Sequence, residues 1–468
     1  MFKTNLSPID EPHNLGLIQF GTDGIRGCVN SFLTPALALK IGYWFGQVLL
    51  SEGPVLIGID SRNSSLMISS AITAGINASG RDVLSLGLCP TPALPNIIRR
   101  FSAAGGIMVS ASHNPPQDNG IKVFGSNGAK LNDTQQRTIE AALQGRIEDN
   151  ITSRIAQRKS SYGSYHQRYD LLEFYRNSLL ASVKNKRLDG ARIVLDLCCG
   201  SATVCSAEVF QALGADLILL NSEPDGSRIN VGCGSTNLTP LQVAVTQNSA
   251  DMGFSFDGDA DRVLAVDGRS NIVDGDHILY LWGLDLMKKD ELPSNRLVAT
   301  DMSNLAFEKT WHNLGGIFER TRVGDKYVSK TMEITGAALG GEQSGHIISL
   351  QNGMSGDGLL TALKVATLIQ DWGGTLSDWM LNSFNPYPQK LVNIHLLNSN
   401  NINEWMNHEQ LKEIIEKAKL AMNNQGRILI RPSGTEPILR VMVEALDIEM
   451  VEYWANKIVK TIQPNFIN

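Results

Sequence analysis

The chain has 468 residues, of which 43% are hydrophobic and 19% are charged, and this length predicts about two to four domains. The net charge of −6 argues against a general nucleic-acid or anionic-membrane binder, because such partners favour a basic surface, although a local basic pocket for a small phosphorylated substrate stays open. Neither an apolar run of roughly 18–20 residues nor a signal-peptide core is present, so we expect a cytoplasmic protein.

Three stretches share one local pattern: a short β-branched strand that ends in aspartate, small polar residues, and then helical spacing of apolar residues. They are Val55–Asp60 followed by 61–78, Ile193–Asp196 followed by 204–213, and Leu297–Asp301 followed by a helix to Leu314 with Ser303 or Asn304 as its cap. Alternation of strand and helix predicts parallel sheets covered by helices. We therefore expect three similar α/β domains.

The C-terminal part of the chain follows a different pattern, without regular alternation of strand and helix. We expect strands at Leu391–Leu396, Arg427–Ile430 and Ile438–Val443, and helices at Glu409–Met422 and Ile448–Ile462. Such an arrangement is typical of a smaller α+β domain, and the proline-containing segment 382–389 is the expected linker before it. The resulting domain boundaries are 1–160, 161–268, 269–384 and 385–468.

A polar segment with the sequence SASHNP, Ser110–Pro115, follows an apolar strand expected at Ile107–Val109 and precedes one expected at Ile121–Phe124. A serine in a loop at a strand end is exposed and positioned by rigid neighbours, which suits a nucleophile or a phosphoryl carrier. Its residue types are also turn formers, so a plain polar turn explains the segment equally well when it is taken alone.

Three carboxylates alternate with small residues in Asp257-Gly258-Asp259-Ala260-Asp261, directly before Arg262. Such carboxylates can converge on one hard cation, and oxygen ligands suit Mg²⁺. An EF-hand loop would need glycine at its sixth position and glutamate at its twelfth, where this chain has Arg262 and Gly268, so that calcium site is excluded. A solvated acidic turn is the remaining alternative.

Two glycine-containing turns carry groups that bind sugars or phosphates. In Gly340–His346 (GGEQSGH), Glu342 and Ser344 offer an acceptor and a hydroxyl at alternate positions, as needed to hold vicinal sugar hydroxyls. In Arg431–Pro437 (RPSGTEP), a guanidinium, two hydroxyls and glycine-freed N–H groups describe a phosphate-binding nest. An inter-strand turn explains the first segment equally well, and a plain β-turn is the alternative for the second.

Two further stretches supply cations. The loop Gly21–Gly27 (GTDGIRG) brings Arg26 within reach of a phosphate, and Thr321–Tyr327 (TRVGDKY) supplies Arg322 and Lys326. Surface cations are common, so each of these residues is a weak signal by itself.

The six cysteines are too few for a disulfide scaffold in a chain of this length. Cys198, Cys199 and Cys205 lie close together in sequence, but no paired C-x-x-C sets or matching histidines accompany them. We therefore favour buried reduced thiols over a zinc site.

Together these motifs resemble the α-D-phosphohexomutase family from Phe20 to the terminal helix, in the family's order and at its approximate spacing. Their forms are similar to the branch of the family that acts on glucosamine phosphates. The resemblance implies three similar α/β domains with mixed sheets covered by helices and a smaller fourth α+β domain around a central cleft. It also implies Mg²⁺, a catalytic phosphoserine and a hexosamine or hexose 1,6-bisphosphate as activator. We expect a monomer or homodimer without a nucleic-acid or membrane partner.

The resemblance also implies roles for individual residues. Ser112 would bear the phosphoryl group and touch the Mg²⁺ held by Asp257, Asp259 and Asp261. Arg26 and Lys122 would flank the reacting group, and Lys122 is favoured over His113 and His346 for proton transfer. The expected substrate-binding residues are Arg262, Arg322, Lys326, Glu342, Ser344 and His346, with Arg431, Ser433, Gly434 and Thr435 for the phosphate that is not reacting.

The implied reaction interconverts glucosamine 6-phosphate and glucosamine 1-phosphate through a 1,6-bisphosphate, and its product would feed UDP-N-acetylglucosamine and cell-wall precursor synthesis.

Two departures from the family pattern stand out. The segment 60–65 lacks a glycine often found there, and Ala260 replaces a usual glycine, which matters only if that residue needs a positive φ.

Three alternatives are weaker. A mutase of the same family for glucose or mannose phosphates would use identical machinery. A sugar-phosphate sensor without activity predicts loss of the serine or of an aspartate, yet all are present. A serine hydrolase would need a G-x-S-x-G elbow, which is missing here.

Overall fold

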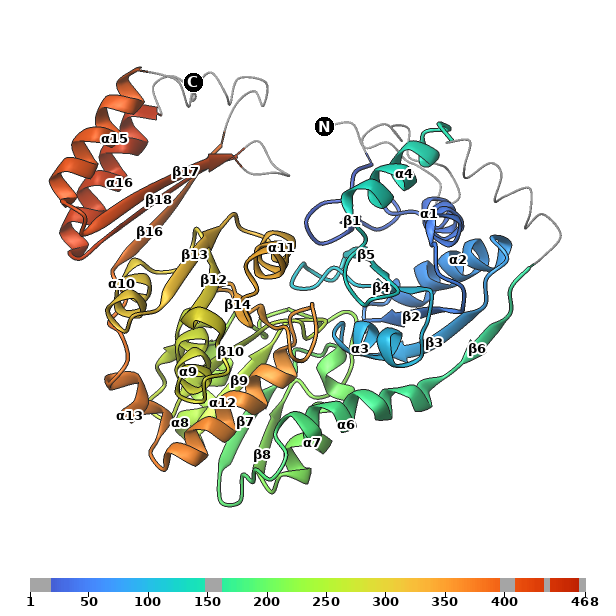
Figure 1. Cartoon of the computed structure of the whole chain (residues 1–468), viewed down its shortest axis with the longest axis horizontal. Coiled ribbons are helices and arrows are strands. Elements are labelled where there is room, and N and C mark those ends of the chain that lie inside the picture. Colours follow the sequence, from blue (N-terminus) through green and yellow to red (C-terminus); the bar gives the residue numbers. More distant parts are fainter. Residues whose placement is uncertain (1–17, 148–161, 396–408, 433–437, 463–468) are drawn as a thin grey trace. The chain divides into compact units, whose positions relative to one another are not determined.

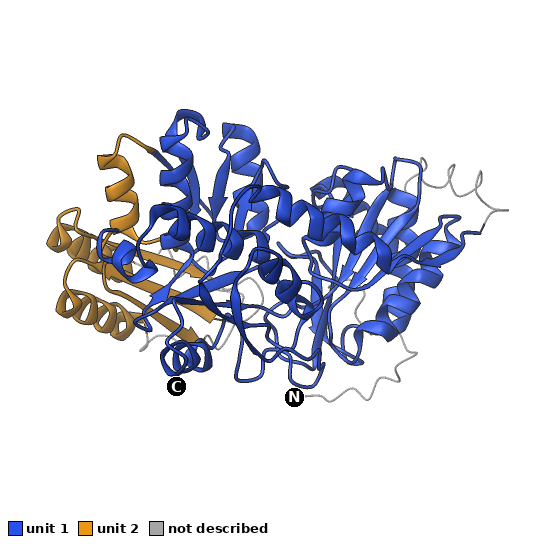
Figure 2. Ribbon diagram, turned by 90° about the horizontal axis from the view of Figure 1, so that it is seen from below, with its two compact units in different colours: residues 1–300, 317–383 blue, residues 301–316, 384–468 orange. Residues whose placement is uncertain are grey.

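The computed structural model describes residues 18–147, 162–395, 409–432 and 438–462 (Figure 1). In this described part the strands form four sheets. The chain divides into two compact units, Met1–Thr300 with Ile317–Ser383 and Asp301–Gly316 with Phe384–Asn468 (Figure 2). Over the described ranges, no helix combines the length and apolar character needed to cross a membrane.

The first sheet of the larger unit has the strand order β1-β5-β4-β2-β3-β6 and is mixed, since β5 runs antiparallel to both β1 and β4. Its strands span Ile25–Cys28 (β1), Val55–Ile59 (β2), Val83–Leu88 (β3), Gly105–Val109 (β4), Asp118–Gly125 (β5) and Tyr165–Gln167 (β6). The helices span Pro35–Val48 (α1), Ser65–Ala78 (α2), Ala93–Arg100 (α3) and Asp133–Leu143 (α4). Because β3 and β4 flank β2 on opposite sides, right-handed crossovers place α2 and α3 on opposite faces of the sheet (Figure 1).

The second sheet has the order β11-β10-β9-β7-β8. Its strands span Arg192–Asp196 (β7), Asp216–Leu220 (β8), Met252–Phe256 (β9), Val263–Asp267 (β10) and Ile272–Val273 (β11). The helical segments span Tyr169–Leu171 (η2), Leu172–Ser182 (α6), Ser201–Val204 (η3), Ser206–Ala212 (α7) and Thr239–Gln247 (α8).

The third sheet has the order β13-β12-β14-β15. Its strands span Arg296–Thr300 (β12), Ile317–Thr321 (β13), Leu339–Gly341 (β14) and Ile347–Ser349 (β15). The helical segments of the larger unit around it span Gly275–Lys288 (α9), Pro293–Asn295 (η4), Asp325–Thr335 (α11), Gly358–Trp372 (α12) and Leu376–Leu381 (α13).

These three sheets repeat one strand plan. Four successive strands, β2–β5, β7–β10 and β12–β15, have the same arrangement: the first of the four lies between the second and the third, both parallel to it, and the fourth runs antiparallel beside the third. The turn from the third strand to the fourth, which joins β4 to β5, β9 to β10 and β14 to β15, carries the serine, aspartate and Glu342 segments respectively. The repeated α/β plan expected from the sequence is therefore confirmed, and it places three candidate site segments at equivalent positions.

The smaller unit contains an antiparallel sheet with the order β16-β18-β17. Its elements span Gln389–His395 (β16), Glu409–Met422 (α15), Gly426–Pro432 (β17), Ile438–Ala445 (β18) and Ile448–Ile462 (α16), with α10 at Leu305–Asn313. Glu444, fully buried on β18, accepts the backbone N–H of Leu305 at 2.7 Å and thereby caps α10. Arg427 donates to the carbonyls of Asp301 and Ser303, so the segment before α10 is also bound to this unit.

The sequence-based elements agree closely with this fold. Both C-terminal helices have the expected bounds, and Asn304 rather than Ser303 caps α10 by accepting the N–H of Ala306 at 3.0 Å. The helix expected within 61–78 spans Ser65–Ala78, and Ser61–Ser64 form the turn that follows β2. The six cysteines are free, and five of them, including Cys198, Cys199 and Cys205, are buried, as expected for reduced thiols.

Candidate active site

Ser112 lies just beyond the end of β4, where its side chain meets the aspartate loop. It is fully buried rather than exposed as expected, because this loop covers it. Its hydroxyl donates to Asp257 Oδ2 at 2.5 Å, and its backbone has φ +54°. A left-handed conformation at a non-glycine residue costs about 1–2 kcal/mol and persists only where surrounding contacts enforce it.

Contacts from the turn after β2 enforce this conformation. The guanidinium of Arg62 donates to the carbonyls of Ser112 at 2.8 Å and Asn114 at 2.7 Å, and also to those of Pro115 and Asp118. Asp60 accepts from Arg62 Nε at 2.9 Å and keeps the buried guanidinium in place. The turn after β2 thus organises the loop that follows β4.

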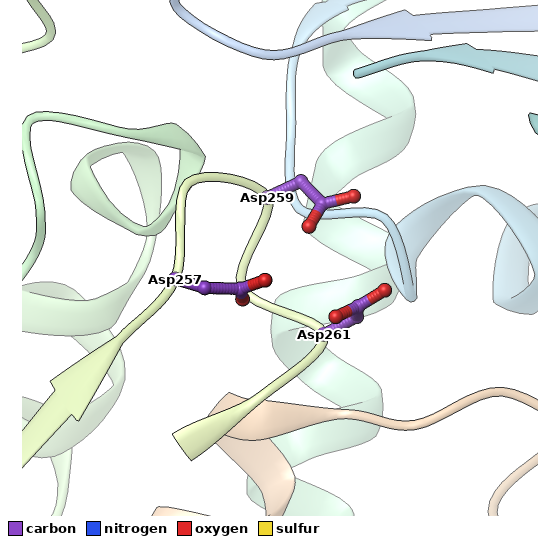
Figure 3. A group of neighbouring side chains, drawn as sticks. All are labelled: Asp257, Asp259 and Asp261. Carbon is purple, nitrogen blue, oxygen red and sulfur yellow. The ribbon is translucent and has the colours of Figure 1, made fainter. Parts of the chain in front are cut away.

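The three predicted metal ligands lie together in the turn between β9 and β10 (Figure 3). Asp257, Asp259 and Asp261 are buried, and one oxygen from each falls within 4.8 Å of the others. Asp259 Oδ2 accepts from the Thr91 hydroxyl at 2.5 Å, and Asp261 Oδ2 accepts from Lys122 at 2.7 Å.

The free oxygens of this triad fit a hard divalent cation. Among the described residues, Asp259 Oδ1 and Asp261 Oδ1 are buried without a hydrogen-bond partner. A buried carboxylate oxygen without a donor is costly, and an all-oxygen ligand set suits Mg²⁺. Burial, followed by the neighbouring Asp261 and Asp259, raises the pKa of Asp257 well above its ordinary value, a repulsion that a cation would relieve.

Ala260, at the centre of the triad, has φ +56°. The substitution of alanine for the family's usual glycine therefore falls at a position that needs a left-handed backbone. Ala260 is also fully buried, and its carbonyl accepts the N–H of Gly358 at 3.0 Å, so the turn is fixed despite the strain.

Lys122 on β5 is the cation nearest to the triad. Its ammonium lies 2.6 Å from Asp259 Oδ2, 2.7 Å from Asp261 Oδ2 and 3.1 Å from Asp23 Oδ2. Burial opposes a charged lysine, but these carboxylates outweigh it and raise the pKa of Lys122 well above its ordinary value. Lys122 is therefore a cation at neutral pH in this arrangement, able to bind a phosphoryl group or to donate a proton.

Asp23 connects further cations to this network. It forms ion pairs with Arg26 on β1 and with Lys130, and Lys130 also pairs with Asp325 at the start of α11. Burial by itself would raise the pKa of Asp23, but Lys122, Lys130 and Arg26 hold it well below its usual range. Opposite charges thus alternate from the triad to α11.

Two histidines lie beside the serine and the aspartate triad. His113 Nδ1 lies 3.2 Å from Ser112 Oγ, and burial followed by the charges of Arg262 and Arg26 lowers the pKa of His113 to about 3, so its imidazole is neutral. His346 Nδ1 lies 3.5 Å from Asp261 Oδ1, while its Nε2 accepts the N–H of Gly356 at 3.1 Å. Arg262, another residue of the predicted site, also contacts the triad: its backbone N–H donates to Asp257 Oδ1 at 3.2 Å.

The turn between β14 and β15 holds the predicted sugar ligands. Glu342 is buried, and its Oε1 accepts the N–H of Gly324 at 2.9 Å, while Ser344 is exposed. Lys326, in the first turn of α11, pairs with Asp133, and Arg322 is exposed just before α11. Because Gly324 directly precedes α11, its hydrogen bond to Glu342 links that residue to the start of this helix.

The predicted phosphate nest belongs to the smaller unit. Arg431 is half-buried near the end of β17. Ser433, Gly434 and Thr435 lie outside the described residues.

Several residues that shape the site were not predicted. Thr91 holds Asp259, Arg62 organises the serine loop, Asp23 gathers the cations, and Asn230 donates to the carbonyls of Ser112 and Asn114 at 2.9 Å each. Asp23 lies inside the GTDGIRG motif and could have been found there. Thr91 and Asn230 carry no local signal, because each acts on a loop more than 100 positions away in sequence.

Comparison with protein families covers most of the chain. Models of phosphoglucomutase/phosphomannomutase match all along it: α/β/α domain I at residues 17–149, domain II at 173–270, domain III at 274–387 and the C-terminal domain at 391–461.

Individual proteins and structures are similar as well. A phosphoglucosamine mutase of Prochlorococcus marinus (strain MIT 9303) is 57% identical over 97% of this chain and 96% of its own length. One from Synechococcus sp. (strain CC9902) is 55% identical over 99% and 98%. A phosphoglucomutase/phosphomannomutase family protein from Burkholderia thailandensis has a similar fold, with a TM-score of 0.77 at 23% identity over 95% of this chain and 98% of its own. Aspergillus fumigatus N-acetylphosphoglucosamine mutase, solved with GlcNAc-6P and magnesium, has a TM-score of 0.67 at 18% identity over 96% of each chain.

Proposed function

This chain belongs to the phosphoglucomutase/phosphomannomutase family, the α-D-phosphohexomutases, and we propose that it interconverts glucosamine 6-phosphate and glucosamine 1-phosphate as an isomerase. Relatives named phosphoglucosamine mutase, 55–57% identical over nearly the whole chain, support this substrate. Its cytoplasmic location and its state as monomer or homodimer stay predictions from the sequence.

The observation that carries the proposal is the contact between Ser112 Oγ and the aspartate triad. The hydroxyl lies 2.5 Å from Asp257 Oδ2 in a buried cluster of three carboxylates. Four negative groups in so small a space, once Ser112 bears a phosphoryl group, require a divalent cation and neighbouring basic groups. Lys122, Arg26 and Arg262 supply the basic groups.

We propose that Asp257, Asp259 and Asp261 hold Mg²⁺ together with the phosphorylated Ser112. The cation would neutralise charge that develops on the transferring phosphoryl oxygens. Lys122 would bind the same phosphoryl group from the side of β5, and Arg26 would lie beside it. His113, neutral beside Ser112 Oγ, would donate a hydrogen bond from Nδ1 to that oxygen without adding charge.

The remaining predicted residues would bind the sugar phosphate. Glu342 and Ser344 would hold sugar hydroxyls, and Arg262, Arg322, Lys326 and His346 would contact the substrate around them. Arg431, with Ser433, Gly434 and Thr435, would bind the phosphate that is not reacting.

The reaction then proceeds in two transfers. The bond between Ser112 Oγ and phosphorus breaks while a sugar hydroxyl of glucosamine 6-phosphate bonds to the same phosphorus, giving the 1,6-bisphosphate. The departing Ser112 Oγ takes up a proton, which cationic Lys122 would donate, and Lys122 would regain a proton from the sugar hydroxyl as that hydroxyl bonds to phosphorus. After the bisphosphate reverses its orientation, Ser112 Oγ receives the phosphoryl group at position 6, the proton returns to the sugar oxygen, and glucosamine 1-phosphate leaves. A hexosamine or hexose 1,6-bisphosphate would recharge a dephosphorylated serine.

Replacement of Ser112 by alanine tests the proposal. Wild-type protein incubated with a hexose 1,6-bisphosphate should gain about 80 Da on the peptide containing Ser112, the mass of one phosphoryl group. Ser112→Ala should show no gain and should lose several decades of mutase rate. Unaltered turnover in this variant would overturn Ser112 as the phosphoryl carrier.

Relative kcat/KM on glucosamine, glucose and mannose 6-phosphates tests the substrate. We expect glucosamine 6-phosphate to have the highest value. A higher value for mannose or glucose 6-phosphate would instead support the alternative of a phosphomannomutase or phosphoglucomutase within the same family.

A further inference from the structure

We infer that Asn230 is a positioning residue for phosphoryl transfer, which holds the Ser112 turn against the loop that carries the aspartate triad. This inference rests on the proposed function of Ser112. Asn230 lies in the long connection between β8 and α8. Asp257 lies further along the chain, directly after β9 of the same sheet. Its amide Nδ2 donates to the carbonyls of Ser112 and Asn114, at 2.9 Å each.

A hydrogen bond to the amide oxygen of Asn230 fixes the orientation of this amide. Asn230 Oδ1 accepts from the thiol of Cys198, with sulfur and oxygen 3.0 Å apart, so the nitrogen faces the serine turn. Asn230 itself has φ +62°, a conformation that asparagine tolerates better than most residues. The residue is therefore held in a defined geometry at both ends of its side chain.

The two carbonyls bound by Asn230 are those that Arg62 also binds. Arg62 reaches them from the same sheet as Ser112, whereas Asn230 reaches them from the connection that follows β8 in the second sheet. Arg62 can thus shape the turn, but it does not fix the turn relative to Asp257. Asn230 supplies that second constraint.

Close packing around Asn230 agrees with a role in alignment. A Cβ added to Gly258, between two of the aspartates, would lie 2.7 Å from the Ser112 carbonyl oxygen and 3.1 Å from Asn230 Nδ2. The backbone of the triad loop therefore touches the same carbonyl that Asn230 binds. Because Ser112 is in a strained conformation, loss of one donor should let its Oγ move away from the reacting position.

Asn230→Asp tests this inference, because it keeps the shape of the side chain and removes both N–H donors. A matched control is available at Asn77, whose Nδ2 also bridges two backbone carbonyls, those of Arg81 and Ser164, at 3.0 Å each. Asn77 lies at the end of α2, and neither of the two carbonyls that it binds belongs to the serine turn. Asn230→Gly, which suits the positive φ, serves as a second variant should the aspartate impair folding.

The measurement is the rate at which Ser112 gains a phosphoryl group from glucose 1,6-bisphosphate with Mg²⁺, followed by quenched-flow mass spectrometry, alongside the thermal midpoint, kcat and KM. We expect Asn230→Asp and Asn230→Gly to slow this transfer and kcat by about tenfold to a hundredfold with KM changed less than about threefold. In Asn77→Asp, Ser112 should gain the phosphoryl group at the wild-type rate, even if the thermal midpoint falls as much as in the Asn230 variants.

Three results would overturn the inference. The first is transfer at the wild-type rate in both Asn230 variants, and the second is equal slowing in Asn77→Asp, which would indicate a general loss of stability. In both cases phosphorylation of the wild-type serine would still support the proposed function. The third is the absence of phosphorylation in wild-type protein, which would overturn the proposed function itself.

Discussion

Thr91 binds Asp259 twice: its backbone N–H donates to the Asp259 carbonyl at 2.9 Å, and its hydroxyl donates to Oδ2 at 2.5 Å. Both residues are buried; Thr91 lies between β3 and α3, and Asp259 lies in the turn between β9 and β10. Because the hydroxyl holds Oδ2, Asp259 Oδ1 is left facing inward without a donor in the described structure. Thr91 thus orients a proposed metal ligand from outside the ligand set.

Thr91→Val should therefore weaken divalent cation binding. Valine keeps the shape of threonine but leaves Asp259 Oδ2 with Lys122 alone, and loss of such an outer hydrogen bond typically costs about 10–100-fold in metal affinity. Calorimetric titration with Mn²⁺ measures this change. Thr91→Ser, which retains the hydroxyl, is the control and should bind nearly as well as wild type; equal affinities for serine and valine would contradict the role of the hydroxyl.

Ala260→Gly should stabilise the protein. Glycine removes the strain of φ +56°, worth about 1–2 kcal/mol, and the larger entropy of the unfolded glycine chain offsets part of that gain. We expect a net increase of about 0.5–1 kcal/mol in the free energy of unfolding, measured with urea. Ala265→Gly in the neighbouring strand β10 has no such strain to relieve and should destabilise instead; a decrease for both variants would show that Ala260 is not strained.

Lys130→Met should destabilise the contact between the first sheet and α11. It leaves the carboxylates of Asp23 and Asp325 without the cation that pairs with both, so we expect a loss of about 1–3 kcal/mol. Urea unfolding measures the loss. Lys186→Met removes a far more exposed pair with Asp371 and should cost less than about 0.5 kcal/mol. Similar losses in the two variants would mean that Lys130 acts as an ordinary surface residue.

Asp357→Asn should stabilise the protein more at high pH than at low pH. Burial raises the pKa of Asp357 to about 6, so the folded state prefers the protonated acid. Its contribution to stability is complete below the ordinary pKa of 3.8 and is lost as the pH rises through about 6. Asparagine can still accept from Tyr175 and cap α12 without a charge. Urea unfolding of both proteins at about pH 8 and about pH 5 should show a difference that shrinks on acidification, and a constant difference would contradict the raised pKa.

Much of this fold follows from local patterns in the sequence. The helices Glu409–Met422 and Ile448–Ile462 have the predicted bounds because their apolar residues recur at helical spacing, and the alternation of strands with helices predicts the three α/β sheets. The serine and aspartate motifs noted in the sequence also meet in the structure, where the Ser112 hydroxyl donates to Asp257.

The features missed by the sequence analysis depend on the tertiary fold. The positive φ of Ala260 arises because its turn must bring three carboxylates together, and the burial of Ser112 arises from a loop that begins 145 residues later. Asn230 and Thr91 have ordinary neighbours in sequence, so only folding shows which loops they bind. The segment Asp301–Gly316 joins the C-terminal unit for the same reason, since Arg427 and Glu444 bind it from a distance.

The shared strand order of the three sheets has a consequence for how such a protein can diversify. Each sheet has one hairpin at the same place, and the three hairpins carry different groups: the hydroxyl of Ser112, the carboxylate cluster and the buried carboxylate of Glu342. With the roles proposed above, the third hairpin could change to suit a new sugar while the first two keep their strands and side chains. Under the proposed roles, substrate preference and phosphoryl transfer would then be adjustable separately within one repeated architecture.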